Sequence, residues 1–441
     1  MRGRRIFAWI LTGILCAAAV PAPAGATSGN KGDPPELISE SAVLIDADTG
    51  QVLFEKEMDK QQFPASITKI ITVTLALENG KMADTITMSD EAVFSVARNT
   101  SHIALTPGEE ITLEQAAYAA MMVSANDACN GIAEYVSGSI PEFAKLMTEK
   151  AKEWGAKGTQ FNNANGLKDD QHYTTAYDMA MIMRHALTNE TFRKIIGTKT
   201  YDMPPNNKQK DTRHFTNQHS MLTDPKFEYP GIIGGKAGYT TAAKYTLVTA
   251  AERDGVTLIA VVMKSPKLND KYKDTSALLD YGFENFSRVE IPPKDLKQDD
   301  LSATSAAGEA ETVSLSMEEG IQFLLHKNVN KKDVIQKLDV PEPFTQDSVA
   351  TMTLSLPENV TCMYRQIGVF PYAHEIVAAM SPVETEEQVR KHPVLQALKI
   401  IGIVLAVIVG GFLVLVLVLY IRKRLYYRKR RRRGRYNRRY K

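Results

Sequence analysis

Residues 64–77 read PASITKIITVTLAL, and this stretch decides both the fold and the chemistry that we expect. Isoleucines recur within it at helical spacing, which predicts a helix over residues 66–78. Ser66 and Lys69 are three positions apart, so on a helix their side chains share one face. A serine becomes a strong nucleophile only when a base takes its proton, and a neutral lysine is such a base. The stretch therefore predicts a serine–lysine catalytic pair.

Two short strings further along the chain supply the other groups that such a pair needs, Ser124-Ala125-Asn126 and Lys236-Ala237-Gly238. Ser124 can hydrogen-bond the amine and carry a proton to a leaving group, and Asn126 can align a peptide bond. Lys236 adds a second positive charge, which lowers the pKa of a neighbouring lysine. Taken singly, the strings have ordinary structural explanations: a helix N-cap, a polar break in a helix and a charged loop. Their joint occurrence favours a catalytic site.

Two predicted hairpins enclose a largely helical stretch of sequence. Residues 41–54 and 245–263 each read as two β-rich runs around a tight turn. Helices are expected over residues 113–136, with a break near Ser124, and over 175–187 after a capping box. This order predicts an α+β domain whose sheet joins its first and last segments.

The ends of the chain read as export and anchoring signals. The first 26 residues are basic, then apolar, then rich in small residues, which is typical of a secretory signal. Residues 400–421 carry no charge and are long enough to span a membrane as a helix. The expected organisation is a signal peptide (1–26), a catalytic domain (35–286), a small β-rich domain (288–382), a connector (383–399), a transmembrane helix (400–421) and a basic cytoplasmic tail (422–441).

The tail holds 13 Lys and Arg residues and no acid. Basic residues next to a transmembrane helix are the usual signal for its cytoplasmic end, so we expect a single-pass anchor and no nucleic-acid partner. Removing these 13 charges and the three arginines of the signal from the net +2 leaves −14 for residues 27–399. Cys129 and Cys362 remain after signal removal, too few for a disulfide framework.

Several strings resemble one family in particular. The combination of S-x-x-K, S-x-N and a K-T-G-type string marks penicillin-binding proteins and serine β-lactamases. The longer strings are similar to the low-molecular-mass D-alanyl-D-alanine carboxypeptidases. They are Pro64–Lys69, Met122–Ala128, Phe161–Leu167, His172–Ala176 and Leu279–Phe283.

The resemblance implies a fold, a reaction and a place in the cell. The fold would be an antiparallel sheet with helices on both faces, followed by a β-rich domain and a membrane anchor. The substrate would be a peptidoglycan stem pentapeptide, β-lactam antibiotics would acylate the same serine, and the catalytic domain would lie outside a bacterial cell membrane. The implied catalytic residues are Ser66 (nucleophile), Lys69 (base) and Ser124 (proton relay), and the implied substrate-binding residues are Asn126, Lys236, Gly238, Tyr239 and Thr240.

The third string departs from the family pattern at Ala237, where Thr or Ser is usual. A hydroxyl there helps to hold the substrate carboxylate, and losing a hydrogen bond to a charged group costs about 1.5–3 kcal/mol. Strand alternation points Thr240 to the side of Gly238, away from Tyr239. We therefore expect a weakened carboxypeptidase. The alternative is a pseudoenzyme that binds stem peptides and recruits wall-synthesis partners.

Other classes of protein fit less well. A β-lactamase needs a deacylating glutamate, and no Glu-x-x-Leu-Asn segment lies between Asn126 and Lys236. The spacing of His172, His214 and His219 matches no common zinc pattern, so we expect neither metal nor cofactor. His172 is expected to be structural. No protein partner is predicted.

Overall fold

The computed structural model describes residues 33–296, 301–304, 310–315, 319–339, 350–357, 366–372 and 374–376. The expected signal peptide, connector, transmembrane helix and basic tail all lie outside these residues. In the part of the chain that is described, none of the helices has the length and apolar character to cross a membrane.

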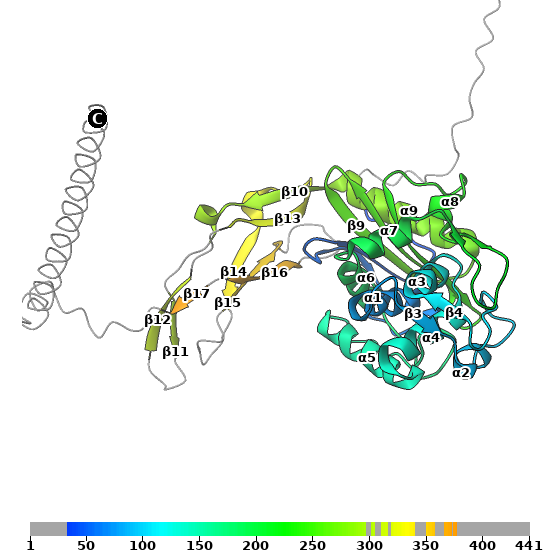
Figure 1. Ribbon diagram of the computed structural model, residues 1–441. Coiled ribbons are helices and arrows are strands. Elements are labelled where there is room, and N and C mark those ends of the chain that lie inside the picture. Colours follow the sequence, from blue (N-terminus) through cyan, green and yellow to red (C-terminus); the bar gives the residue numbers. More distant parts are fainter. Residues whose placement is uncertain are drawn as a thin grey trace, which may run out of the picture. The chain divides into compact units, whose positions relative to one another are not determined.

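A five-stranded antiparallel sheet forms the frame of the catalytic region (Figure 1). The two expected hairpins are confirmed, and the pairing of the first strand with Val256–Ser265 joins them into one sheet. The last strand in the order lies at an edge. Across the sheet the strands are β2 (Val52–Lys56), β1 (Ser41–Asp46), β9 (Val256–Ser265), β8 (Lys244–Arg253) and β7 (Ile232–Thr240).

Helices cover both faces of this sheet. Successive side chains of a strand point to opposite faces, so Val43 and Ile45 of β1 join one hydrophobic cluster while Ala42 and Leu44 join another. The second cluster includes α9 (Leu268–Asn285). The first includes α1 (Lys69–Asn79), α3 (Leu113–Met122), α4 (Asn126–Ser137), α5 (Ile140–Glu153), α6 (Ala176–Ala186) and α7 (Glu190–Gly197).

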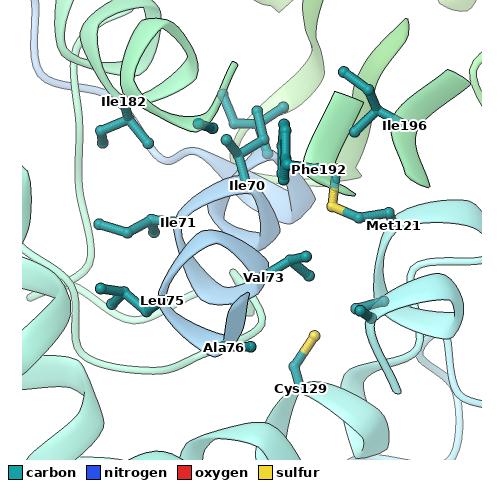
Figure 2. Packing of buried hydrophobic residues seen from close by; sticks show 14 of the residues in the cluster. Ile70, Ile71, Val73, Leu75, Ala76, Met121, Cys129, Ile182, Phe192 and Ile196 are labelled. Atoms are coloured by element: carbon teal, nitrogen blue, oxygen red, sulfur yellow. The ribbon is translucent and has the colours of Figure 1, made fainter. Parts of the chain in front are cut away.

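Helix α1 lies inside the first cluster and is buried on all sides along Lys69–Ala76. Figure 2 shows its side chains among Phe192, Met121 and Cys129, which come from three other helices. The expected helix is present, but it begins as the 3-10 turn η1 (Ala65–Thr68) before α1. Its many β-branched residues favour helix only weakly, so packing stabilises it. A lysine in its first turn is thereby held in a dry core.

Shorter elements surround the helices. The break expected near Ser124 separates α3 from α4. Of the predicted capping box only the first half is present: the Thr175 side chain accepts from the Asp178 amide, while the Asp178 carboxylate accepts from Gly158 and Thr159. The remaining elements before α9 are β3 (Thr85–Thr87), α2 (Asp90–Phe94), β4 (Glu110–Thr112), β5 (Thr200–Met203), β6 (Arg213–Thr216) and α8 (Ser220–Thr223).

The chain after α9 is built from strands and two short 3-10 turns. Strands β10 and β13 pair with each other, β14, β15 and β16 form a second small sheet, and β11, β12 and β17 form a third. The chain divides into two compact units. The second unit contains β11 and most of β12 and β17, and the first unit contains the other elements. The bounds are β10 (Phe286–Ile291), η2 (Pro293–Asp295), β11 (Leu301–Thr304), β12 (Ala310–Leu315), β13 (Ile321–His326), η3 (Lys331–Asp333), β14 (Ile335–Asp339), β15 (Ala350–Ser355), β16 (Gln366–Tyr372) and β17 (His374–Ile376).

Strands β10 and β13 are tied to the turn between β1 and β2. The Gln51 side chain donates to the Leu324 carbonyl at 2.8 Å and accepts from the Leu324 amide at 2.9 Å. Arg288 binds the buried Asp46 at 3.2 Å and the exposed Asp48 at 2.5 Å. The catalytic sheet and β10–β13 therefore share hydrogen bonds and an ion pair within the first unit.

Candidate active site

Ser66 lies in η1, and two strands of the central sheet hold the backbone around it. Thr246 on β8 donates to the carbonyl of Pro64 at 3.0 Å. A Cβ atom on Gly238 of β7 would lie 2.8 Å from the Ser66 amide nitrogen, so only glycine allows this approach. Ala65 has φ +53°, an unfavourable value for a residue with a side chain. The tight turn sets the edge strand directly beside the half-buried Ser66.

The Lys69 amine is fully buried and makes three hydrogen bonds. As an ammonium it donates to Asn126 Oδ1 at 2.7 Å, to the Asn165 carbonyl at 2.5 Å and to Ser66 Oγ at 3.2 Å. A neutral amine keeps only two N–H donors and gains a lone pair. The two amide oxygens only accept, so they use both donors and leave the lone pair facing the Ser66 hydroxyl. This is the orientation that a general base requires.

Burial also favours the neutral form of this lysine. Removal from water lowers the pKa of Lys69 to about 8, and the neighbouring Cys129 and Asp127 side chains oppose the shift. An amine with this pKa is neutral in an appreciable fraction of molecules near neutral pH. The predicted mechanism needs a lysine that can lose its proton, and the burial of α1 provides one.

Ser124 lies in the break between α3 and α4, and Asn126 is the first residue of α4. Ser124 has φ +63°, in the left-handed region, and its hydroxyl donates to Ser66 Oγ at 2.8 Å. The sequence analysis paired the Ser124 hydroxyl with the Lys69 amine. In the structure Ser124 binds the Ser66 hydroxyl instead, and Asn126 binds the amine. Asn126, the Asn165 carbonyl and the Ser66 hydroxyl are the three hydrogen-bond partners of the Lys69 amine.

Lys236 of β7 is buried, and its amine donates to the Ala237 carbonyl at 2.9 Å. Burial lowers its pKa well below the usual value, and the positive charges of Lys69 and Lys271 lower it further. Lys271 of α9 is a second buried cation, which sequence analysis missed. Its amine lies 4.9 Å from the centroid of the Tyr272 ring, and burial lowers its pKa to about 8. Two buried lysines therefore lie close to each other beside β7, and each adds positive charge there when it is protonated.

The remaining predicted residues lie at the end of β7. Tyr239 is 53 % exposed and its ring packs at 4.5 Å against Tyr245. The Thr240 hydroxyl accepts from the Ala243 amide at 3.0 Å, so it stabilises the turn into β8. Ala237 packs against the second hydrophobic cluster, on the α9 side of the sheet. The structure gives Thr240 a role in the turn that the sequence analysis did not anticipate.

The loop between α5 and α6 contacts η1 and α1 next to the site. His172 is buried, its Nε2 lies 2.9 Å from Thr68 Oγ1, and its Nδ1 accepts from the Asn162 amide at 3.0 Å. Burial lowers the pKa of His172 to about 4, which keeps the ring neutral. The structural role expected for His172 agrees with these contacts. Asn165 was missed, because it acts through a backbone carbonyl that every residue has.

Neither of the other two candidate histidines lies in a metal site. His214 is exposed and pairs with Asp202 at 2.6 Å, while the buried His219 Nε2 lies 2.9 Å from Thr249 Oγ1. Within the described residues no group of three or more His, Cys, Asp or Glu side chains could hold a metal ion.

Fold and site together define a serine hydrolase of the penicillin-binding type. A model of the D-alanyl-D-alanine carboxypeptidase family, peptidase S11, matches residues 28–267. The carboxypeptidase DacF of Bacillus subtilis is 32% identical over 394 residues, which are 88% of this chain and 95% of the relative. DacA of Escherichia coli is 27% identical over 334 residues, 71% of this chain and 78% of the relative.

Solved structures are also similar to this chain in fold. Penicillin binding protein 5 from Haemophilus influenzae aligns with a TM-score of 0.62 over 79% of this chain and 99% of its own, at 24% identity, and therefore bears on the fold alone. A mutant Streptomyces DD-transpeptidase aligns with a TM-score of 0.53 over 56% of this chain and 99% of its own, at 28% identity. The chain belongs to the D-alanyl-D-alanine carboxypeptidase family, as its sequence strings indicated.

Proposed function

We propose that this chain is a serine-type D-alanyl-D-alanine carboxypeptidase that removes the terminal D-alanine from peptidoglycan stem pentapeptides. The observation that carries the proposal is the buried Lys69 amine, hydrogen-bonded to a Ser66 hydroxyl that also accepts from Ser124. The named relatives are carboxypeptidases. The alternative, a protein that binds stem peptides without cleaving them, gains no support from them.

Acylation follows from the directions of these hydrogen bonds. The neutral Lys69 amine takes the Ser66 proton, and Ser66 Oγ attacks the carbonyl of the penultimate D-alanine. The backbone amides of Ser66 and Tyr239 are the proposed donors to the oxyanion, a role consistent with the close approach of β7 to Ser66. Ser124 gives its hydroxyl proton to the departing amine of D-alanine and takes one from the Lys69 ammonium, which becomes neutral again. Water then hydrolyses the acyl-enzyme and frees Ser66.

Lysines beside strand β7 attract the terminal carboxylate of the substrate when they are protonated. Lys236 and Lys271 are both buried, so their potential is weakly screened by solvent. Asn126, whose oxygen binds Lys69, has its amide group left to meet the substrate backbone. β-Lactams present a carboxylate and a strained amide to the same groups, and we propose that they acylate Ser66.

The test uses the full-length chain and two substrates. Incubation with a diacetyl-Lys-D-Ala-D-Ala peptide should release D-alanine, and fluorescent penicillin should label the protein, with mass spectrometry placing the adduct on Ser66. Ser66→Ala should abolish both signals. The matched control is Ser28→Ala, because Ser28-Gly29-Asn30-Lys31 repeats the S-x-x-K spacing without a helical pattern. Absence of both signals in the unaltered chain would overturn the proposal.

We also propose the cellular arrangement that the ends of the sequence indicate. Residues 1–26 would direct export, and residues 400–421 would anchor the chain by a single pass with the tail of residues 422–441 in the cytoplasm. The catalytic region would then face the peptidoglycan outside the bacterial membrane. The same penicillin label should sediment with membranes, and a labelled protein found only in the soluble fraction would contradict the anchor.

A further inference from the structure

The backbone carbonyl of Asn165 binds the Lys69 amine, and the side chain of Asn165 is fixed by two hydrogen bonds of its own. Asn165 Nδ2 donates to Asn130 Oδ1 at 3.1 Å, and Asn165 Oδ1 accepts from the Leu167 amide at 3.0 Å. Both asparagines are buried, at 5% and 3% exposure. A buried amide pair of this kind fixes orientation, because either group loses its partner if the other turns away.

Asn130 is joined on its other side to the segment around α2. It lies one helical turn after Asn126 on α4, so the two amides share a face of that helix. The Asn130 Nδ2 group donates to the Ala92 carbonyl at 3.2 Å and to Ser95 Oγ at 3.0 Å. One face of α4 thus acts on Lys69 in two ways. Asn126 binds the Lys69 amine directly, and Asn130 binds the side chain of Asn165, whose carbonyl binds the same amine.

The loop that carries Asn165 is pressed against the start of α1. Thr72 donates to the Ala164 carbonyl at 2.6 Å, one turn along from Lys69. Gly166 has φ +85°, and a Cβ atom there would lie 1.9 Å from the Ala65 carbonyl oxygen. Consecutive carbonyls of the loop therefore face α1, and the loop has little room to shift without moving the turn that holds Ser66.

We propose that Asn130 and Asn165 are positioning residues that hold the Asn165 carbonyl on the Lys69 amine and so aim its lone pair at Ser66. The inference rests on the proposed function, since it concerns the base of that reaction. Neither side chain touches the substrate or the reacting atoms. Their effect on catalysis passes through the direction of one hydrogen bond, and displacement of about 1 Å in a catalytic group costs up to about 100-fold in rate.

The expected direction of the pKa shift of Lys69 follows from the loss of one hydrogen-bond acceptor, the Asn165 carbonyl. A carbonyl stabilises an ammonium more than a neutral amine, so losing it lowers the pKa of Lys69 below about 8. The other titratable groups that face the amine are Asp127 and Cys129 on α4, His172 on the loop and Lys236 on β7. All four remain when either asparagine is replaced.

The test is a double-mutant cycle in the full-length chain, with the rate of acylation by fluorescent penicillin measured across pH. Asn130→Ala and Asn165→Ala should each lower the plateau rate about 10- to 100-fold. Each should also move the acid limb of the profile to lower pH. The double variant should be no slower than the slower single variant, because both act through one contact.

A matched control separates positioning from stability. Asn189 caps α7 through bonds to two backbone amides, at 2.9 and 3.2 Å, and does not touch the site. Asn189→Ala should lower the thermal midpoint and leave the acid limb in place. If Asn130→Ala lowers only the thermal midpoint, or if the two effects multiply in the double variant, the inference is wrong. If the unaltered chain is not acylated, the proposed function fails instead.

Discussion

The two walls of the site act on the substrate by different means. The wall formed by η1, α1 and α4 works through side-chain hydrogen bonds among Ser66, Lys69 and Ser124. The wall formed by β7 brings a close backbone approach at Gly238 and the buried lysine Lys236. We therefore expect activity to depend strongly on each side chain of the first wall, and less on the side chain at position 237 of the second.

The largest effect is expected on the first wall, for Lys69→Met. Methionine fills a similar volume but cannot accept a proton, so acylation by fluorescent penicillin should slow by about 100- to 10,000-fold. In the unaltered chain the rate should rise with pH and reach half its plateau near pH 8, because burial lowers the pKa of Lys69 to about 8 and only the neutral amine is a base. The variant should lose this dependence.

Lys56→Met is the control for that substitution. Lys56 lies on β2, toward the other edge of the sheet, and its amine donates to two backbone carbonyls at 2.7 Å. The control should keep the rate and the half-maximal pH of the unaltered chain. An unchanged pH profile in Lys69→Met would show that another group is the base.

On the second wall the largest effect should come from Gly238→Val. The new Cβ atom would meet Thr246 Oγ1 at 2.5 Å and the Ser66 amide at 2.8 Å, so β7 must move away from the turn. We expect a loss of about 100-fold in D-alanine release, measured as kcat/KM, from misplacement of the backbone beside Ser66. Gly255→Val in the β8–β9 turn is the control for lost stability, because its φ of +75° strains any side chain while a Cβ atom there meets nothing within 4 Å, so the strain falls on the turn and not on Ser66. Equal activity of the two variants would refute the role of the close approach.

The smallest effect is expected for Ala237→Thr. Ala237 packs on the α9 side of the sheet, and under the proposed function the substrate carboxylate is attracted by two buried lysines. We expect kcat/KM for D-alanine release to rise less than about tenfold, below the range of a full hydrogen bond to a charged group. Ala237→Val, of similar shape without a hydroxyl, is the control. A rise of about 100-fold in the threonine variant alone would make the two walls equally dependent on side chains.

The elements of the catalytic region could be predicted because each leaves a local pattern. The hairpin over residues 245–263, the break at Ser124 and the helix after Ser66 all appear where periodicity and turn residues place them. The pairing of the first and last segments in one sheet also followed from hairpins at both ends of an α+β domain, but the strand order was not predicted. The motif residues Ser66, Lys69 and Ser124 could be chosen because only their joint spacing makes chemical sense.

Other parts of the site leave no pattern in the sequence. Asn165 acts through its carbonyl, and Lys271 is brought close enough to Lys236 to lower its pKa by the packing of α9 against the sheet. The partner of Ser124 was assigned wrongly: its hydroxyl binds Ser66, and Ser124 itself has a left-handed backbone that the sequence did not indicate. The missed features are thus backbone groups, long-range packing and one unusual dihedral angle.

The ties between the catalytic sheet and β10–β13 bear on where this enzyme could be cut. Cleavage after Asn285 would take away Arg288, the cation beside the buried Asp46 carboxylate, and both backbone partners of the Gln51 amide. Burial already raises the pKa of Asp46, and removing one partner of a buried ion pair costs about 3–5 kcal/mol. The smallest autonomous folding unit should therefore extend through His326, so that a protease acting just after α9 would destabilise the enzyme without touching its catalytic residues.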